Sequence, residues 1–334
     1  MYFARGAENK KCLNKSIKLI FNYLLAPVLF ILLTFSLYRQ VIQQPDLDTR
    51  WQQVLHSVNE PGLWLAALLM LLNYGIEAWK WKLLLRPLES TGLKRSLASV
   101  FAGCSVTMLT PNRIGEFGGR ILFVKEHNRP EAISLTILGS LSQLMITMLA
   151  GIAGLIWLDF SDIDTGRFSW VTGNFLLPAS VVFTLLLLFV YFRVGIVISV
   201  IERITILKSF VKYIRVVRTF PGKLLLRILW LSFLRYMVFI LQYMLILHVM
   251  GVHIPAVLSF YLLAVFYLVL AVAPTFGFIE LPLRAAASLE LLGSFSDNIV
   301  GIQSAAFVVW IINLVIPAII GSLLIFGIKI IKEK

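Results

Sequence analysis

The chain has 334 residues, of which 59% are hydrophobic and 14% are charged, and its mean hydropathy is +0.88. Soluble domains carry roughly 25% charged residues, so this composition excludes the pair of soluble domains that length alone would suggest. The formal net charge of +13 would indicate a nucleic-acid partner in a soluble protein, but in a membrane protein it is typical of short cytoplasmic loops. The sequence therefore predicts an all-α polytopic membrane protein.

Six apolar runs are long enough to cross a bilayer, whose hydrocarbon core of about 30 Å needs roughly 20 apolar residues per helix. The run that comes first follows several lysines, but its apolar stretch is too long for a signal peptide and no cleavage site follows it. We therefore predict an uncleaved helix there. In chain order the six predicted spans cover residues 17–37, 63–79, 132–158, 174–192, 228–250 and 299–326.

Two further apolar segments are interrupted by proline. Residues 96–124 break at 110–112, and residues 256–292 break at 274–277. Proline removes a backbone donor and forces the preceding residue out of helical geometry. Irregular backbone survives in lipid only where protein buries it or where it faces a water-filled cavity. Both segments are therefore predicted to be re-entrant hairpins with their tips at membrane depth.

The distribution of Lys and Arg predicts the orientation. With the N-terminus placed in the cytoplasm, 25 of the 30 basic residues fall on the inner side and three on the outer side. This asymmetry favours a protein of the cell (inner, cytoplasmic) membrane with both termini inside. It also accounts for most of the net charge, so we expect no nucleic-acid partner.

The order of two spans, a hairpin and another span occurs twice. It covers residues 1–158 and again residues 174–334, and the two halves enter the membrane from opposite sides. Glu-x₃-Arg follows the proline in both hairpins. Inverted repeats with broken helices are typical of transporters whose substrate site lies between the repeats. We therefore expect a single integral membrane domain over residues 1–334.

Other patterns predict contacts with the membrane surface and with other helices. Residues 197–220 have the periodicity of an amphipathic helix that either lies on the anionic leaflet or simply connects two spans. Interfacial aromatic anchors are predicted at Trp64, Trp79 and Trp81. The small-residue face Gly151-x-x-Gly154 allows helix association, which leaves a homo-oligomer open.

Ionisable residues at the hairpins are the candidate substrate-binding site. An ionised side chain at membrane depth costs on the order of 2.5–3.5 kcal/mol, so it needs a partner or a function. The alternative is that the glutamates and arginines only neutralise each other. The candidates are Asn112, Arg113, Glu116 and Arg120 on the first hairpin, and Glu280 and Arg284 on the second.

The first hairpin is the more informative of the two. Its Glu116 and Arg120 are four residues apart and share a helical face, so they are predicted to pair. The planar guanidinium of Arg113 is suited to a phosphate, and Gly118 and Gly119 allow a ligand or another backbone to come close.

The remaining ionisable residues are less informative. Pro282 lies between Glu280 and Arg284 and complicates the same pairing in the second hairpin. Glu77 and Arg235 on neighbouring spans fit either a structural or a functional role, whereas His248 is interpreted as structural. The two cysteines and four histidines lack metal-binding spacing, so neither a metal nor a cofactor is expected.

The hairpin motifs resemble a known family. T-P-N-R-I-G-E-F-x-x-R at 110–120 and P-T-F-G-F-I-E at 274–280 look like motifs of the lysylphosphatidylglycerol synthase transmembrane family. Phe276 and Phe278 replace glycines that are usual in the second motif. The resemblance implies a flippase-like membrane domain that translocates a phospholipid or a polyprenyl-phosphate-type lipid. It also implies that Arg113, Glu116, Arg120 and Glu280 are the matching polar positions.

Three functions remain open from the sequence. The leading hypothesis is a transporter that moves an anionic or aminoacylated phospholipid, or a polyprenyl-phosphate-type lipid, between leaflets. An intramembrane enzyme acting on a lipid phosphate is an alternative, although no histidine or cysteine stands beside the first motif. The third possible function is a non-transporting scaffold that gathers lipid or a lipid-synthesising partner. Family synthases carry a soluble aminoacyl-transferase domain after the membrane part, and because the chain stops at Lys334 without one, we expect no aminoacylation.

Overall fold

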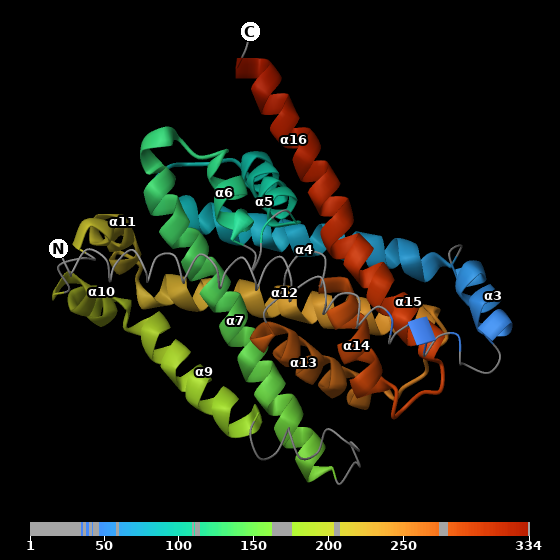
Figure 1. Ribbon diagram of the computed structural model, residues 1–334. Coiled ribbons are helices and arrows are strands. Elements are labelled where there is room, and N and C mark those ends of the chain that lie inside the picture. Colours follow the sequence, from blue (N-terminus) through green and yellow to red (C-terminus); the bar gives the residue numbers. More distant parts are fainter. Residues whose placement is uncertain are drawn as a thin grey trace, which may run out of the picture.

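The computed structural model describes residues 47–57, 60–108, 110, 114–161, 176–203, 208–273 and 280–332, together with the single residues 35, 38, 39 and 42. All regular structure within these ranges is helical, as the sequence predicted. The α-helices, labelled as in Figure 1, are α3 (Leu47–Ser57), α4 (Pro61–Leu85), α5 (Leu93–Met108), α6 (Gly115–Ile121), α7 (Arg129–Phe160), α9 (Leu177–Phe192), α10 (Val194–Arg203), α11 (Lys208–Arg218), α12 (Gly222–Val249), α13 (Ala256–Val272), α14 (Glu280–Leu292), α15 (Ile299–Trp310) and α16 (Ile316–Lys332). The short helices are the 3₁₀ helix η3 (Glu126–Asn128) and the π-helix η7 (Ile311–Val315).

Helices of membrane-spanning length establish a multi-pass membrane protein. In the described part of the chain, four helical stretches are long and apolar enough to cross a bilayer: Pro61–Leu85, Glu126–Phe160, Gly222–Val249 and Ile299–Gly327. The helices α9 and α13 are apolar but shorter. The predicted span at 17–37 lies outside the described residues.

The helix α4 is longer than its predicted span of 63–79. It begins with Pro61 at the first helical turn, where a missing N–H costs nothing, and it continues through Lys80 and Lys82 to Leu85. The prediction ended the span at Lys80 because it assigned this cation to a cytoplasmic loop. In the structure Lys80 is fully buried inside the protein.

Two antiparallel helix pairs lie on opposite sides of the molecular centre. In Figure 1, α4 and α12 run side by side across the middle, with α5 and α6 above them and α13 and α14 below. The helices α5 and α6 pack closely because Gly115 and Gly119 face the backbone of α5. A Cβ at either glycine would collide with a carbonyl oxygen, that of Val106 or that of Ala102.

Each pair begins and ends at the same place. Before α5, the Leu88 carbonyl accepts a hydrogen bond from Asn128 Nδ2 at 3.2 Å, beyond the end of α6. Before α13, the Met250 carbonyl accepts one from Asn298 Nδ2 at 3.1 Å, beyond the end of α14. An asparagine just before the next long helix therefore closes each pair. The tips, at residues 109–113 apart from Thr110 and at 274–279, lie outside the described residues.

One long helical stretch links the two pairs. Its first part, α15, packs against α14 and α12, whereas its last part, α16, packs against α5, where Ser322 Oγ is hydrogen-bonded to Ser105 Oγ at 2.7 Å. Between them, Asn313 of η7 accepts a hydrogen bond from the Tyr74 hydroxyl of α4 on its backbone carbonyl, at 2.6 Å. Its Nδ2 donates to Gln242 Oε1 of α12 at 2.8 Å.

The predicted amphipathic helix over residues 197–220 is wrong as a single helix. The structure has α10 and α11, which pack against each other and are joined by an ion pair between Arg215 Nη2 and Glu202 Oε1 at 3.2 Å. Thirteen residues of continuous helix would separate these side chains by about 20 Å. The helix α3 was not predicted, because the region 38–62 was interpreted as a loop.

Two other sequence interpretations change. Trp64 and Trp79 are exposed, as anchors would be, but Trp81 is completely buried. Two residues correspond to about 200° of helix rotation, so Trp79 and Trp81 point to opposite faces. Gly151 and Gly154 face α13 of the same chain, so their surface is filled internally and gives no support to a homo-oligomer.

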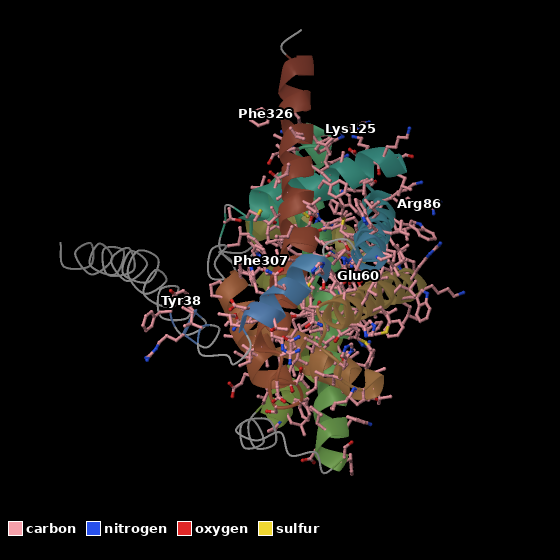
Figure 2. The ribbon with its side chains drawn as sticks, turned by 90° about the vertical axis from the view of Figure 1, so that its right-hand side faces the viewer. Tyr38, Glu60, Arg86, Lys125, Phe307 and Phe326 are labelled. Carbon is pink, nitrogen blue, oxygen red and sulfur yellow. The ribbon has the colours of Figure 1, made fainter. Side chains whose placement is uncertain are left out.

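Figure 2 relates the ends of α4 to the first helix pair. Lys125, which follows α6, lies above Arg86, which follows the end of α4, and Glu60, at the start of α4, lies lower still. Because Lys125 N donates a hydrogen bond to Glu89 Oε2 at 3.1 Å, the exposed cations Arg86 and Lys125 belong to the region where the α5–α6 pair begins and ends.

Candidate functional site

Charged side chains from α4, α6 and α12 meet inside the protein. We define this charge cluster, among the described residues, as Glu77, Lys80, Glu116, Arg120 and Arg235. Glu77 lies at its centre. Its Oε1 accepts a hydrogen bond from Arg120 Nη2 at 2.7 Å, and its Oε2 accepts from Arg235 Nη1 at 2.7 Å. Lys80 Nζ forms an ion pair with the same Oε2 at 2.8 Å.

Arg120 joins the two carboxylates of the cluster. Its Nη2 donates to Glu116 Oε1 as well as to Glu77. The guanidinium lies over the ring of Trp81, with Cζ 5.2 Å from the ring centroid, an arrangement that stabilises a cation. Trp81 is held in turn by a hydrogen bond from its Nε1 to Ser99 Oγ at 2.8 Å. The α4 face that carries Glu77 therefore also supports the arginine that binds it.

The other two cations have further partners. Lys80 Nζ donates to the Gly139 carbonyl of α7 and to Ser232 Oγ of α12, both at 3.3 Å. Arg235 Nε donates to Asn73 Oδ1 at 2.7 Å. Each cation thus has at least one partner besides Glu77, which helps to offset the cost of burying it.

The cluster is unbalanced in charge and uneven in exposure. Three cations face two carboxylates, so the described members carry one net positive charge. The side chains of Glu77, Lys80 and Arg120 are 3% exposed or less, whereas Glu116 is 23% exposed and Arg235 is 15% exposed. An anion would therefore reach the cluster at Glu116 and Arg235.

One donor in the cluster remains unused. Arg120 Nε is buried and has no hydrogen-bond partner among the described residues. A buried N–H without a partner costs about 1–3 kcal/mol, so it is expected to bind something. Both the missing negative charge and the unused donor favour an anionic ligand.

The second hairpin carries an ion pair of its own. Arg284 donates to Glu280 Oε1 from both Nε, at 3.1 Å, and Nη2, at 2.8 Å. Pro282 therefore does not prevent the i,i+4 pairing, because it lies in the first helical turn, where its missing N–H breaks no helical bond. This pair lies outside the charge cluster.

The structure divides the sequence-predicted residues into separate groups. Glu116 and Arg120 form the predicted contact, and Glu280 and Arg284, whose pairing was left open, are also paired. The two pairs lie on different helix pairs on opposite sides of α4 and α12. Asn112 and Arg113 lie outside the described residues.

The sequence did not predict that Glu77 lies at the centre of the cluster or that Lys80 belongs to it. The i,i+3 spacing of these residues on α4 was the available signal.

The polar features outside the cluster that the structure describes include a pair of histidines. His248 lies against His253, with ring centroids 5.1 Å apart, in a groove of about 450 Å³ between the end of α12 and the start of α13. Across the described ranges, no group of three or more His, Cys, Asp or Glu side chains is placed to hold a metal ion.

Comparison with known proteins gives one family. The sequence model of the lysylphosphatidylglycerol synthase TM region matches residues 20–321, which include both hairpins and every member of the charge cluster. This match confirms the resemblance seen in the two hairpin motifs. No curated protein and no solved structure is similar enough to the chain to give a match.

Proposed function

Because the chain belongs to the lysylphosphatidylglycerol synthase TM region family, we propose that it is a transporter that moves a lipid with an anionic, phosphate-bearing headgroup between leaflets. The observation that carries this proposal is the charge cluster, which holds one excess positive charge and an unused N–H among apolar helices. Ionisable groups at such depth are costly and typically mark a substrate pathway. A phosphate would supply both the negative charge and the acceptor oxygens.

Inverted repeats would place this site between the two halves of the protein. Asn128 and Asn298 close the two helix pairs in the same way, and the pairs lie on opposite sides of α4 and α12. This similarity supports two re-entrant hairpins that enter from opposite leaflets. The four long helices, the shorter α9 and residues 17–37 would then make six spans. In such an architecture the site is reached alternately from each side.

The route follows from which side chains are exposed. The headgroup would enter at Glu116 and Arg235, while the acyl chains remain in the surrounding bilayer. Arg235 would contact the phosphate directly, because its guanidinium is the more accessible of the two in the cluster. By the symmetry of the repeats, the Glu280–Arg284 pair would open toward the opposite leaflet.

Translocation in proteoliposomes tests this function. We expect the protein to move fluorescent phosphatidylglycerol faster than empty liposomes do, and Arg235→Gln to lower the rate at least about tenfold, equivalent to about 1.4 kcal/mol. This variant leaves Glu77 with Lys80 and Arg120 as partners, so the core of the cluster is retained. The matched control is Arg215→Gln, which removes an exposed arginine of α11 and should keep the wild-type rate.

The same assay separates the alternatives. A wild-type rate equal to that of empty liposomes would contradict transport, and specific lipid co-purification without transport would favour a scaffold. Chemical conversion of the lipid, detected by mass spectrometry after incubation, would favour an enzyme. Equal rates for Arg235→Gln and the wild-type protein would contradict the proposed site.

A further inference from the structure

The two hairpin arginines use the same edge of the guanidinium differently. In every arginine, the Nε–H and the Nη2 group lie side by side and can bind two oxygens of one anion. Arg284 closes this edge, since both nitrogens donate to Glu280. Arg120 leaves it half open, because Nη2 donates to Glu116 and Glu77 while Nε has no partner among the described residues.

Glu116 occupies this edge incompletely. Its Oε1 takes only the Nη2 position, and its side chain is the most exposed in the charge cluster. Glu77, in contrast, is buried and paired with three cations, so its displacement would remove a carboxylate partner from all three. Of the two carboxylates on Arg120, Glu116 is therefore the one that a ligand can replace.

The exposure of Glu116 leaves room for its carboxylate to move. Its side chain is 23% exposed, whereas that of Arg120 is 3% exposed. Behind Glu116, Gly103 of α5 has only a hydrogen where a side chain would press on Glu116 and Arg120. The carboxylate can therefore swing away from Arg120 toward its exposed side.

We propose that Glu116 is an internal competitor for the substrate. It holds Arg120 until an oxyanion binds both Nε and Nη2, and it then swings outward. This inference rests on the function proposed above, because it concerns the same site and names what the site selects. Phosphate offers two oxygens in one group, so it can accept hydrogen bonds from both Nε and Nη2 of Arg120. Glu116 accepts a hydrogen bond from Nη2 alone.

Charge balance defines the preferred phosphate. After it swings outward, Glu116 remains ionised beside the cluster, so the total charge there stays at one net positive and a phosphodiester, which has a single negative charge, makes it neutral. A phosphomonoester with close to two negative charges overcompensates it. Glu116 therefore both competes for Arg120 and sets the headgroup charge that the site accepts.

Binding measurements on the purified full-length protein test the inference. Short-chain phosphatidylglycerol, short-chain phosphatidic acid and inorganic phosphate are titrated separately by calorimetry at constant ionic strength. The wild-type protein should prefer phosphatidylglycerol to phosphatidic acid. Glu116→Gln should bind phosphatidylglycerol at least about tenfold more tightly and should shift the preference toward phosphatidic acid. Inorganic phosphate distinguishes a free-phosphate site from a lipid site, because it should bind more weakly than either lipid.

The matched control is Glu126→Gln, which makes the same change at an exposed glutamate outside the charge cluster and should leave both affinities unchanged. Thermal unfolding in the same detergent checks that the variants are folded. Unchanged or weaker phosphatidylglycerol binding by folded Glu116→Gln would overturn the inference, as would an equal effect of Glu126→Gln or tighter binding of inorganic phosphate than of lipid. These outcomes are independent of transport. A protein that translocates lipid without the Glu116 effect refutes the competitor alone, whereas tighter binding without translocation refutes the transporter alone.

Discussion

At the residue scale, the sequence predicted one pair within the cluster but not the contacts that join it to the other three members. The spacing of Glu116 and Arg120 was sufficient to predict their pair, because residues four apart share a helical face. Lys80 was missed because a cation near the end of an apolar run is normally a loop residue. Only the packing of α7 and α12 against α4 shows that Lys80 is buried. Local spacing thus reveals pairs within a helix, whereas partners between helices depend on the fold.

Removing the central carboxylate should destabilise the protein. Glu77→Gln leaves Lys80, Arg120 and Arg235 with one carboxylate fewer, and breaking a buried pair in this way costs about 3–5 kcal/mol. Denaturant unfolding in detergent measures the loss. The control is Glu126→Gln, whose side chain is exposed and should change stability little. Equal stabilities of the two variants would contradict the central role of Glu77.

A pair of glycine variants tests how closely α5 packs against Glu116 and Arg120. In Gly103→Ala, the new Cβ would lie 3.1 Å from Arg120 Cγ and 3.3 Å from the Glu116 carbonyl, so the pair must shift. We expect translocation to slow by about tenfold, which corresponds to about 1.4 kcal/mol. Gly118→Ala meets open space and should retain the wild-type rate, with a gain in helix stability of up to about 1 kcal/mol. A slower Gly118→Ala than Gly103→Ala would contradict the geometry.

At the element scale, the proline breaks were reliable signals and the surface helices were not. Two apolar arms around each proline predicted the α5–α6 and α13–α14 pairs, because proline cannot continue a helix interior. The periodicity of 197–220 could not reveal that α10 and α11 fold back on each other, since each has the same amphipathic pattern. The length of the apolar run also predicted too short a helix for α4. The helix continues past this run because Lys80 is buried by protein instead of facing solvent or lipid.

The π-helix η7 should depend on its asparagine. Asn313→Leu removes the donor to Gln242 Oε1, which lies in the buried interface of α4 and α12 and loses a partner there. The cost of a stranded buried acceptor is about 1–3 kcal/mol of unfolding free energy. Thermal unfolding, compared with Leu323→Ala at an exposed position of α16, measures it. If the two variants unfold alike, η7 is not held by this contact.

At the scale of the whole molecule, composition was enough to predict a multi-pass helical membrane protein, and the four long helices confirm it. The orientation and the re-entrant hairpins remain predictions, because they concern the bilayer as well as the chain. The hydrogen bond that joins the two ends of the α5–α6 pair makes a specific statement about them. Both ends of this pair should face the same aqueous compartment.

Accessibility of single cysteines tests this topology. In a background with Cys12 and Cys104 replaced by serine, Arg86→Cys and Lys125→Cys should both react only from the cytoplasmic side with a membrane-impermeant maleimide. Glu60→Cys, at the other end of α4, should react only from the outside. Reaction of the Arg86 and Lys125 positions from opposite sides would exclude a re-entrant α5–α6 hairpin.

The central claim is that a lipid phosphate binds the charge cluster inside the membrane. Its most direct test is a cryo-EM structure of Glu116→Gln in nanodiscs containing phosphatidylglycerol. We predict a phosphate with one oxygen about 2.7–2.9 Å from Arg120 Nε and another at the same distance from Nη2. Lipid phosphates confined to the two headgroup layers, with Arg120 bound only to protein, would contradict the account.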